Sequence, residues 1–330
     1  MAVVLRRHGP PVVALGGGHG LAASLRALRR VTDDLTAIVG VADDGGSSGR
    51  LRAELGVVPP GDLRMALAAL CGDDVWGRTW SKVMQHRFGG HGELRGHATG
   101  NILISALWEE TGSVVEGLDW MVALLRAQGR VLPAATVPLE MVATVAGTIA
   151  DDPAAVTEIR GQNQVAHAGG RVIDSWIEPR DPAACTEAVT AISAAEALIL
   201  APGSWYTSVL PNLQVPGLHA AFVASEARKV LILNLDAEPG ETPGFTADTY
   251  LKVLAHRFPE IRVDVVLADE GFIGESARLA AASHAIGARL MVERLAAVGP
   301  DGMPTAYHDQ DLLAAALGIL VGRGSITAWQ

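Results

Sequence analysis

The chain has 330 residues, 49% of them hydrophobic and 19% charged, a balance that predicts a sizeable folded core and excludes a disordered chain. Its formal net charge of -10 disfavours nucleic acid or an anionic membrane as the main partner, because both require a dominant basic face. Cys71 and Cys185 form no paired motif, and the ten histidines show no metal-binding spacing. We therefore expect neither a disulfide framework nor a structural zinc site.

The first informative segment is a strand, a glycine turn and a helix. Residues 12–15 are a short apolar run, and residues 21–30 carry leucines at helical spacing. Glycines allow close approach of a ligand, and the free N–H groups of a helix start suit a phosphate. The predicted contacts are Gly17, Gly18, His19, Gly20 and Leu21. The strict dinucleotide fingerprint and the Walker motif are both absent, and a tight turn without any ligand is the alternative.

The second segment follows a predicted parallel strand over residues 35–42, which delivers Asp43 and Asp44 to the same edge of the sheet as the glycine turn. Two adjacent carboxylates can grip a ribose diol, hold Mg²⁺ or act as a base. The loop after them adds N–H groups, hydroxyls and positive charge for a diphosphate, from Gly46, Ser47, Ser48 and Arg52. An ordinary surface turn is the alternative.

Helices are predicted from Gly61 to about residue 128, with loops at 72–77 and 89–96. Asp62 is a plausible N-cap at the start of the first helix. Asn101 follows His97 by four residues, so the two side chains share one face if a helix begins at His97. They could contact a ligand, or they could satisfy a helix end.

Residues 130–179 alternate like β-strands, and the β/α pattern then returns. Its elements are a helix at 183–194, a strand at 197–201, a helix after Pro216, a strand at 229–234, a helix at 246–257 and a strand at 263–268. This order predicts one α/β domain over 1–330 with a mostly parallel sheet. Its core is 12–58 and 181–330, and a helical plus small antiparallel insertion occupies about 59–180.

Two later strands also end in polar residues at the predicted ligand edge. Gly203 and Ser204 follow one strand, and Asn234 ends the next. The nearby glutamates Glu238 and Glu241 could line a sugar pocket or hold a metal, and equally could cap the following helix.

Six motifs together resemble the bacterial gluconeogenesis factor family, which is related to 2-phospho-L-lactate transferase. They are Gly-Gly-Gly-His-Gly-Leu from Gly16, Ala-Asp-Asp-Gly-Gly-Ser-Ser-Gly-Arg-Leu-Arg from Ala42, Pro-Pro-Gly-Asp-Leu-Arg from Pro59, Gly-His-Ala-Thr-Gly-Asn from Gly96, Pro-Gly-Ser-Trp-Tyr-Thr-Ser from Pro202, and Glu-Pro-Gly-Glu-Thr from Glu238. The resemblance runs from about residue 12 to about residue 270. It implies a Rossmann-like three-layer α/β fold and binding of nucleotide sugars of the UDP-N-acetylglucosamine type. It also implies a regulatory role in carbon use, cell-wall synthesis and cell shape.

On this resemblance we expect a non-catalytic regulator that requires no cofactor, forms a homo-oligomer and has cell-wall regulatory proteins as partners. Its pocket would be closed by Asp62, Arg64, His97, Asn101, Ser204 and Asn234. The alternative is a transferase that moves a phosphate-linked group with Mg²⁺ held by Asp43 and Asp44. A third hypothesis is an inert scaffold with a vestigial pocket.

The first eleven residues contain no apolar stretch typical of a signal peptide, and the apolar run at 312–321 is too short to cross a membrane. We therefore expect a cytoplasmic protein with no membrane span.

Overall fold

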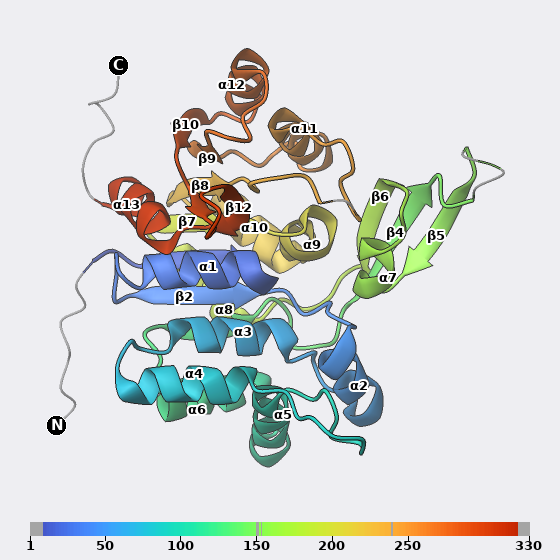
Figure 1. Cartoon of the computed structure of the whole chain (residues 1–330), viewed down its shortest axis with the longest axis vertical. Coiled ribbons are helices and arrows are strands. Elements are labelled where there is room, and N and C mark those ends of the chain that lie inside the picture. The colour runs from blue at the N-terminus through green and yellow to red at the C-terminus, as the bar shows by residue number, and fades with distance from the viewer. Residues whose placement is uncertain (1–8, 150–151, 153, 239, 323–330) are drawn as a thin grey trace.

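A seven-stranded parallel sheet forms the centre of the protein (Figure 1). The computed structural model describes residues 9–149, 152, 154–238 and 240–322, so the amino end on which the signal-peptide expectation rests lies outside them. The strand order is β10-β9-β8-β7-β1-β2-β3. The bounds are β1 Val12–Gly16, β2 Leu35–Val39, β3 Arg130–Pro133, β7 Ala197–Leu200, β8 Arg228–Ile232, β9 Val265–Asp269 and β10 Arg289–Glu293.

The topology creates a ligand-binding position beside β1. Val12 of β1 pairs with Leu35 of β2 on one side and with Ala197 of β7 on the other. The chain runs outward through β2 and β3 and returns through β7 to β10, so the strand order reverses between β1 and β7. In doubly wound sheets of this kind, the loops at the carboxyl ends of the strands diverge at this point and leave a crevice.

Helices pack on the sheet and explain why its strands are continuously apolar. Every residue of β1, β7 and β9 is buried, as expected for parallel strands covered on both faces. Helix α1 packs against α3 and α13, and α8 packs against α10. The bounds are α1 Gly18–Leu28, α2 Gly46–Leu55, α3 Gly61–Leu70, α4 Val75–Gln85, α5 Thr99–Thr111, α6 Val114–Leu125, α8 Thr186–Ala194, α9 Leu210–Gln214, α10 Pro216–Ala224, α11 Ala247–Arg257, α12 Ser276–Ala285 and α13 Gln310–Val321.

A small antiparallel sheet projects from one side of the molecule (Figure 1). Its strand order is β5-β4-β6, and its elements are β4 Glu140–Ala146, β5 Val156–Arg160, α7 Gln162–Ala166 and β6 Arg171–Glu178. The stretch 59–180 that contains it also supplies β3, which pairs in parallel with β2. Helices α2 to α6 therefore form the crossover between two neighbouring strands of the central sheet, and within the stretch 59–180 only the segment from β4 to β6 lies in a separate sheet.

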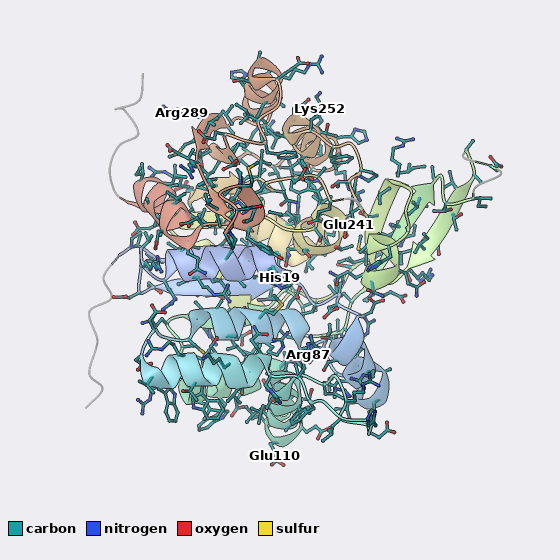
Figure 2. The ribbon with its side chains drawn as sticks, in the orientation of Figure 1. His19, Arg87, Glu110, Glu241, Lys252 and Arg289 are labelled. Carbon is teal, nitrogen blue, oxygen red and sulfur yellow. The ribbon has the colours of Figure 1, made fainter. Side chains whose placement is uncertain are left out.

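The carboxyl-terminal part adds β10, α13 and a hairpin of β11 Ala296–Val298 with β12 Pro304–His308. Charged side chains such as Glu110, Lys252 and Arg289 project from the outside of the molecule (Figure 2). None of the helices in the described ranges has the length and apolar character that a membrane crossing requires. The predicted fold class, a mostly parallel α/β sheet with a small antiparallel addition, is confirmed.

Candidate functional site

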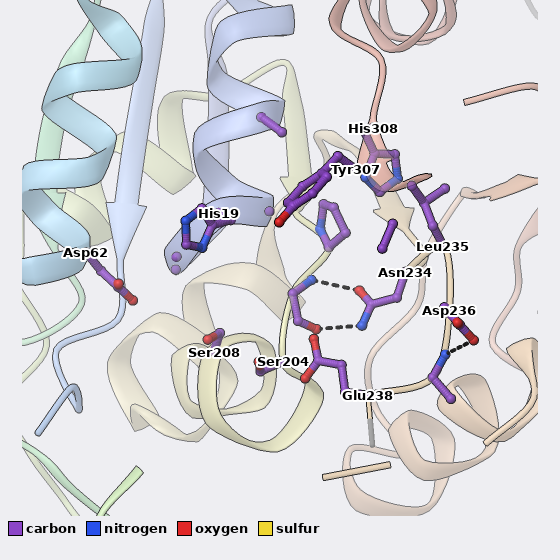
Figure 3. Close-up of a pocket in the computed structure, with 18 of the residues that line it drawn as sticks. His19, Asp62, Ser204, Ser208, Asn234, Leu235, Asp236, Glu238, Tyr307 and His308 are labelled. Carbon is purple, nitrogen blue, oxygen red and sulfur yellow. Dashed lines mark hydrogen bonds between the residues drawn. The ribbon is translucent and has the colours of Figure 1, made fainter. Parts of the chain in front are cut away.

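A cavity of about 760 Å³ lies at the carboxyl ends of β1, β7 and β8 (Figure 3). Nine of the predicted site residues line it: Gly17, Gly18, His19, Gly20, Asp43, Asp62, Gly203, Ser204 and Asn234. The cavity is within the size range of small-molecule sites and lies where an open α/β sheet is expected to bind its ligand.

The glycine turn forms one wall and presents the start of α1 to the cavity. Gly18 has a φ of +59°, which favours glycine, and its N–H donates to the Asp62 carboxylate. A Cβ at Gly20 would lie 1.9 Å from the carbonyl oxygen of Pro202, so only glycine allows the β1 and β7 loops to meet here. Leu21 is buried in the core and does not line the cavity. The free N–H groups of the first helical turn suit an anion.

Two carboxylates, Asp43 and Asp62, lie close together at the base of this wall. Their loops are packed tightly, since a Cβ at Gly61 would lie 2.5 Å from Asp43 Oδ2, and one at Gly17 would lie 2.5 Å from Asp62 Oδ2. Burial and the neighbouring Asp43 charge raise the pKa of Asp62 to about 7. The pair therefore favours a ligand that brings a proton or a cation.

The second predicted loop is a helix. Helix α2 begins at Gly46, so Ser47, Ser48 and Arg52 are helical rather than parts of an open phosphate loop. Ser47 and Ser48 are buried, and Arg52 donates to the carbonyl of Leu139 at 2.8 Å. None of these three side chains lines the cavity. The glycines that suggested a loop instead start α2, whose first N–H groups have no acceptor within the helix.

Three other predicted contacts, Arg64, His97 and Asn101, form a buried hydrogen-bond network with Ser47 outside the cavity. Asn101 Nδ2 donates to Ser47 Oγ at 3.0 Å, and Arg64 Nε donates to Asn101 Oδ1 at 2.9 Å. His97 Nδ1 lies 3.1 Å from Ser47 Oγ, and α5 begins at Thr99, not at His97. Burial, with a contribution from Arg87, lowers the pKa of Arg64 to about 10. The network joins α2, α3 and α5 and fixes the helices behind the glycine turn.

Asp44 does not line the cavity but holds a segment that does. Its Oδ1 accepts from the Asn163 N–H at 2.8 Å, and a Cβ at Gly161 would lie 2.1 Å from its Oδ2. These contacts place the start of α7 against the α2 loop, and Gln162 then lines the cavity. The Asp44 carboxylate therefore affects the cavity indirectly, because it positions the start of α7 and with it Gln162.

The opposite wall is built from the loops after β7 and β8. Asn234 Oδ1 accepts from the Gly203 N–H at 2.8 Å, and its Nδ2 donates to the Gly203 carbonyl at 2.9 Å (Figure 3). This pair of bonds ties the two loops together. Glu238 lines the same wall, and burial raises its pKa, although a hydrogen bond with Ser204 opposes the rise.

Residues after Ser204 form a π-helix, η1 Trp205–Val209, and the buried Glu241 carboxylate accepts hydrogen bonds from its first turn. Glu241 accepts from Thr207 Oγ1 and, at 3.2 Å, from the Tyr206 N–H. Burial raises the pKa of Glu241 to about 7 despite these donors. The sequence left Glu241 either a role in the pocket or a role as a helix cap. The structure supports a cap, but Glu241 caps η1 and not the helix that follows it in the chain.

Ten lining residues lie outside the sequence motifs: Ala23, Arg26, Gln162, Leu235, Asp236, Ala237, Ala306, Tyr307, His308 and Gln310. Three more, Pro202, Ser208 and Glu238, belong to recognised motifs but were not among the predicted contacts. The residues of β12 could be found only through the short β-like run before the Asp309 N-cap of α13.

These features define a doubly wound α/β protein with a polar, partly acidic pocket at its switch point. The model of the family described as 2-phospho-L-lactate transferase CofD matches residues 12–297. A Mycobacterium leprae relative is 47% identical over 323 residues, which cover 97% of this chain and 88% of the relative. A Bacillus subtilis relative named as a gluconeogenesis factor is 37% identical over 260 residues, 79% of this chain and 78% of the relative. The chain belongs to the gluconeogenesis factor family, within the wider CofD family.

A solved structure agrees with this assignment. The crystal structure of a UPF0052 family protein from Bacillus halodurans superposes with a TM-score of 0.81 at 33% identity. The superposition covers 94% of this chain and 99% of that one. The central sheet and its additions are therefore those of the family.

Proposed function

We propose that the protein binds a nucleotide sugar of the UDP-N-acetylglucosamine type and acts as a regulator. The observation that carries this proposal is the cavity at the switch point, with the start of α1 on one wall and the loops tied by Asn234 on the other. A helix start and adjacent glycine N–H groups favour the diphosphate. The carboxylates and amides around them suit the hydroxyl groups of ribose and sugar.

The charges of the cavity favour a diphosphate that carries Mg²⁺. Four lining residues are acidic (Asp43, Asp62, Asp236 and Glu238), against one arginine, Arg26. Mg²⁺ is usually held by one or two carboxylates together with substrate phosphates. Within the described ranges no three acidic, histidine or cysteine side chains are grouped so that they could hold a metal ion.

Asp43 and Asp62 are the residues we assign to this cation, in place of the predicted pair with Asp44. Asp44 is held by the Asn163 N–H and does not line the cavity. The bound ion would neutralise the phosphate charge, and the two carboxylates would orient it.

The proposed binding is tested by calorimetry with UDP, UDP-N-acetylglucosamine, UDP-glucose, GDP and NAD, each with and without Mg²⁺. We expect the UDP-sugars to bind more tightly than GDP or NAD, and Mg²⁺ to strengthen binding. His19→Ala should weaken it severalfold, and His91→Ala serves as the control because His91 is exposed outside the cavity. Absence of UDP-sugar binding would refute the proposal.

A transferase is the second candidate, supported by the description of the matching family and by the carboxylate pair. Transfer requires an acceptor held in line with the reacting bond. We expect no release of UDP or sugar phosphate on overnight incubation with Mg²⁺, as followed by chromatography. Steady product formation that disappears in Asp43→Asn would favour the transferase.

The biological setting is proposed from family membership. We infer a cytoplasmic homo-oligomer that reports nucleotide-sugar levels to cell-wall regulatory proteins and so influences carbon use and cell shape. Cross-linking and a binding partner screen, each with and without the UDP-sugar, would test this role.

A further inference from the structure

The two ends of the cavity differ in chemistry. One end contains Asp43, Asp62 and Gln162 around the glycine turn. The other end contains the apolar and aromatic residues Leu235, Ala237, Ala306 and Tyr307, beside the polar side chains of Asn234, Asp236, Glu238 and His308 (Figure 3). A diphosphate on the helix start would lie between two chemically different groups, one rich in hydroxyls and one planar and less polar.

Tyr307 is the clearest feature of the second end. Its side chain belongs to β12, is 68% exposed and extends over the cavity near His19 (Figure 3). A single exposed aromatic residue needs no functional explanation by itself. Here the ring lies above the same cavity that holds the glycine turn, where a planar ligand group could stack on it.

The hairpin that carries Tyr307 is fixed to the sheet. The Asp269 carboxylate at the end of β9 accepts from the Leu295 N–H at 2.6 Å and the Ala296 N–H at 2.9 Å. Ala296 then pairs with His308, the residue next to Tyr307. The backbone position of Tyr307 is therefore set by its connection to the central sheet.

The match to the transferase family ends at residue 297, before β12 begins. Tyr307 and His308 thus lie outside the matched region although both line the cavity. This part of the wall is where ligand choice could differ from that of the transferase.

We propose that Tyr307 is a specificity-determining residue that stacks on the nucleobase, with Leu235 and Ala306 completing an apolar nucleobase subsite. This inference rests on the proposed nucleotide-sugar function and specifies the orientation of the nucleotide sugar in the cavity. The base lies toward the β11–β12 hairpin, and the sugar lies toward Asp43 and Asp62.

The test compares Tyr307→Ala and Tyr307→Phe with the wild type by calorimetry, using UDP, UDP-N-acetylglucosamine and N-acetylglucosamine 1-phosphate. Met303→Ala is the matched control, since Met303 is 62% exposed in the same hairpin and does not line the cavity. We expect Tyr307→Ala to weaken UDP and UDP-sugar binding roughly tenfold and leave the sugar phosphate unaffected, because only the ring stacking is lost. Tyr307→Phe and Met303→Ala should retain wild-type affinity.

The outcomes separate the two proposals. If the wild type binds UDP-sugars and Tyr307→Ala binds them equally well, the nucleobase subsite is refuted while nucleotide-sugar binding stands. A loss confined to the sugar phosphate would place the sugar at Tyr307 and also refute the subsite. A wild-type protein that binds no nucleotide overturns both. Circular dichroism of each variant confirms that it is folded.

Discussion

Replacing Asp62 with asparagine should stabilise the protein while weakening ligand binding. The carboxyl group is held in a partly buried position beside Asp43, which raises its pKa from an ordinary 3.8 to about 7. The native state therefore retains a proton that the unfolded chain releases between these two pH values. Stability is lost as pH rises from about 3.8 to about 7, and the loss is complete above the higher value.

The magnitude follows from the two pKa values. Each pKa unit corresponds to 1.36 kcal/mol, so a rise of about three units costs about 4 kcal/mol above pH 7. Water reaches a half-buried group and screens part of this cost, so we expect roughly 2–4 kcal/mol. Asparagine removes the charge, retains an oxygen acceptor for the Gly18 N–H and can donate toward Asp43.

Urea unfolding of both proteins at pH 5 and pH 8.5 measures the difference directly. The variant should be more stable at pH 8.5 by the stated amount, and the advantage should shrink at pH 5. Glu241, whose pKa is also raised, titrates in both proteins, so its contribution cancels in the comparison. Asp43→Asn should give part of the same gain, and the double variant less than the sum. A stability difference that does not change with pH would refute the reasoning.

Three further predictions concern how the site is held together. Gly20→Ala should lower the free energy of unfolding by about 3 kcal/mol in chemical denaturation, since its Cβ would meet the Pro202 carbonyl oxygen. Gly18 has a φ of +59° and faces open space, so Gly18→Ala should lower the free energy of unfolding by only about 1–2 kcal/mol. Equal losses of stability in the two variants would contradict this comparison. Asn101→Leu should cost about 2–4 kcal/mol, because it leaves the buried Arg64 Nε without its acceptor and removes one donor to Ser47 Oγ. A thermal midpoint equal to that of the wild type would show that the network is dispensable. Asp44→Ala should release α7 and weaken UDP-sugar binding severalfold with a loss of about 1 kcal/mol in stability. If calorimetry shows unchanged affinity of Asp44→Ala for the UDP-sugar, α7 does not contribute to binding.

The sequence alone predicted five of the seven strands of the central sheet, β1, β2, β7, β8 and β9, and the edge at which the cavity lies, whereas β3 and β10 were not among the predicted strands. Apolar runs such as 12–15 and 197–201, separated by helical segments, predict parallel strands because a helical crossover returns the chain to the same end of the sheet. The glycine turn and Asn234 follow directly from strand ends, so their position at one edge needs no knowledge of tertiary contacts. The same reasoning placed Asp43 beside the turn, whereas Asp62 was expected there only from the family resemblance.

Tertiary structure decided which polar residues line the cavity. His97, Asn101 and Arg64 have side chains suited to a pocket, yet they bond to one another and to Ser47 behind it. A residue type fixes its donors and acceptors but not their partners, which come from helices distant in the chain.

The hairpin at the carboxyl-terminal end shows the same limit. Tyr307 lies nearly 290 residues after His19, and no local pattern connects the two. It reaches the cavity only because β9 holds the hairpin through Asp269, a contact between separate parts of the chain. Local sequence patterns therefore predict strands and turns, whereas the closing wall of the site depends on long-range packing that they do not encode.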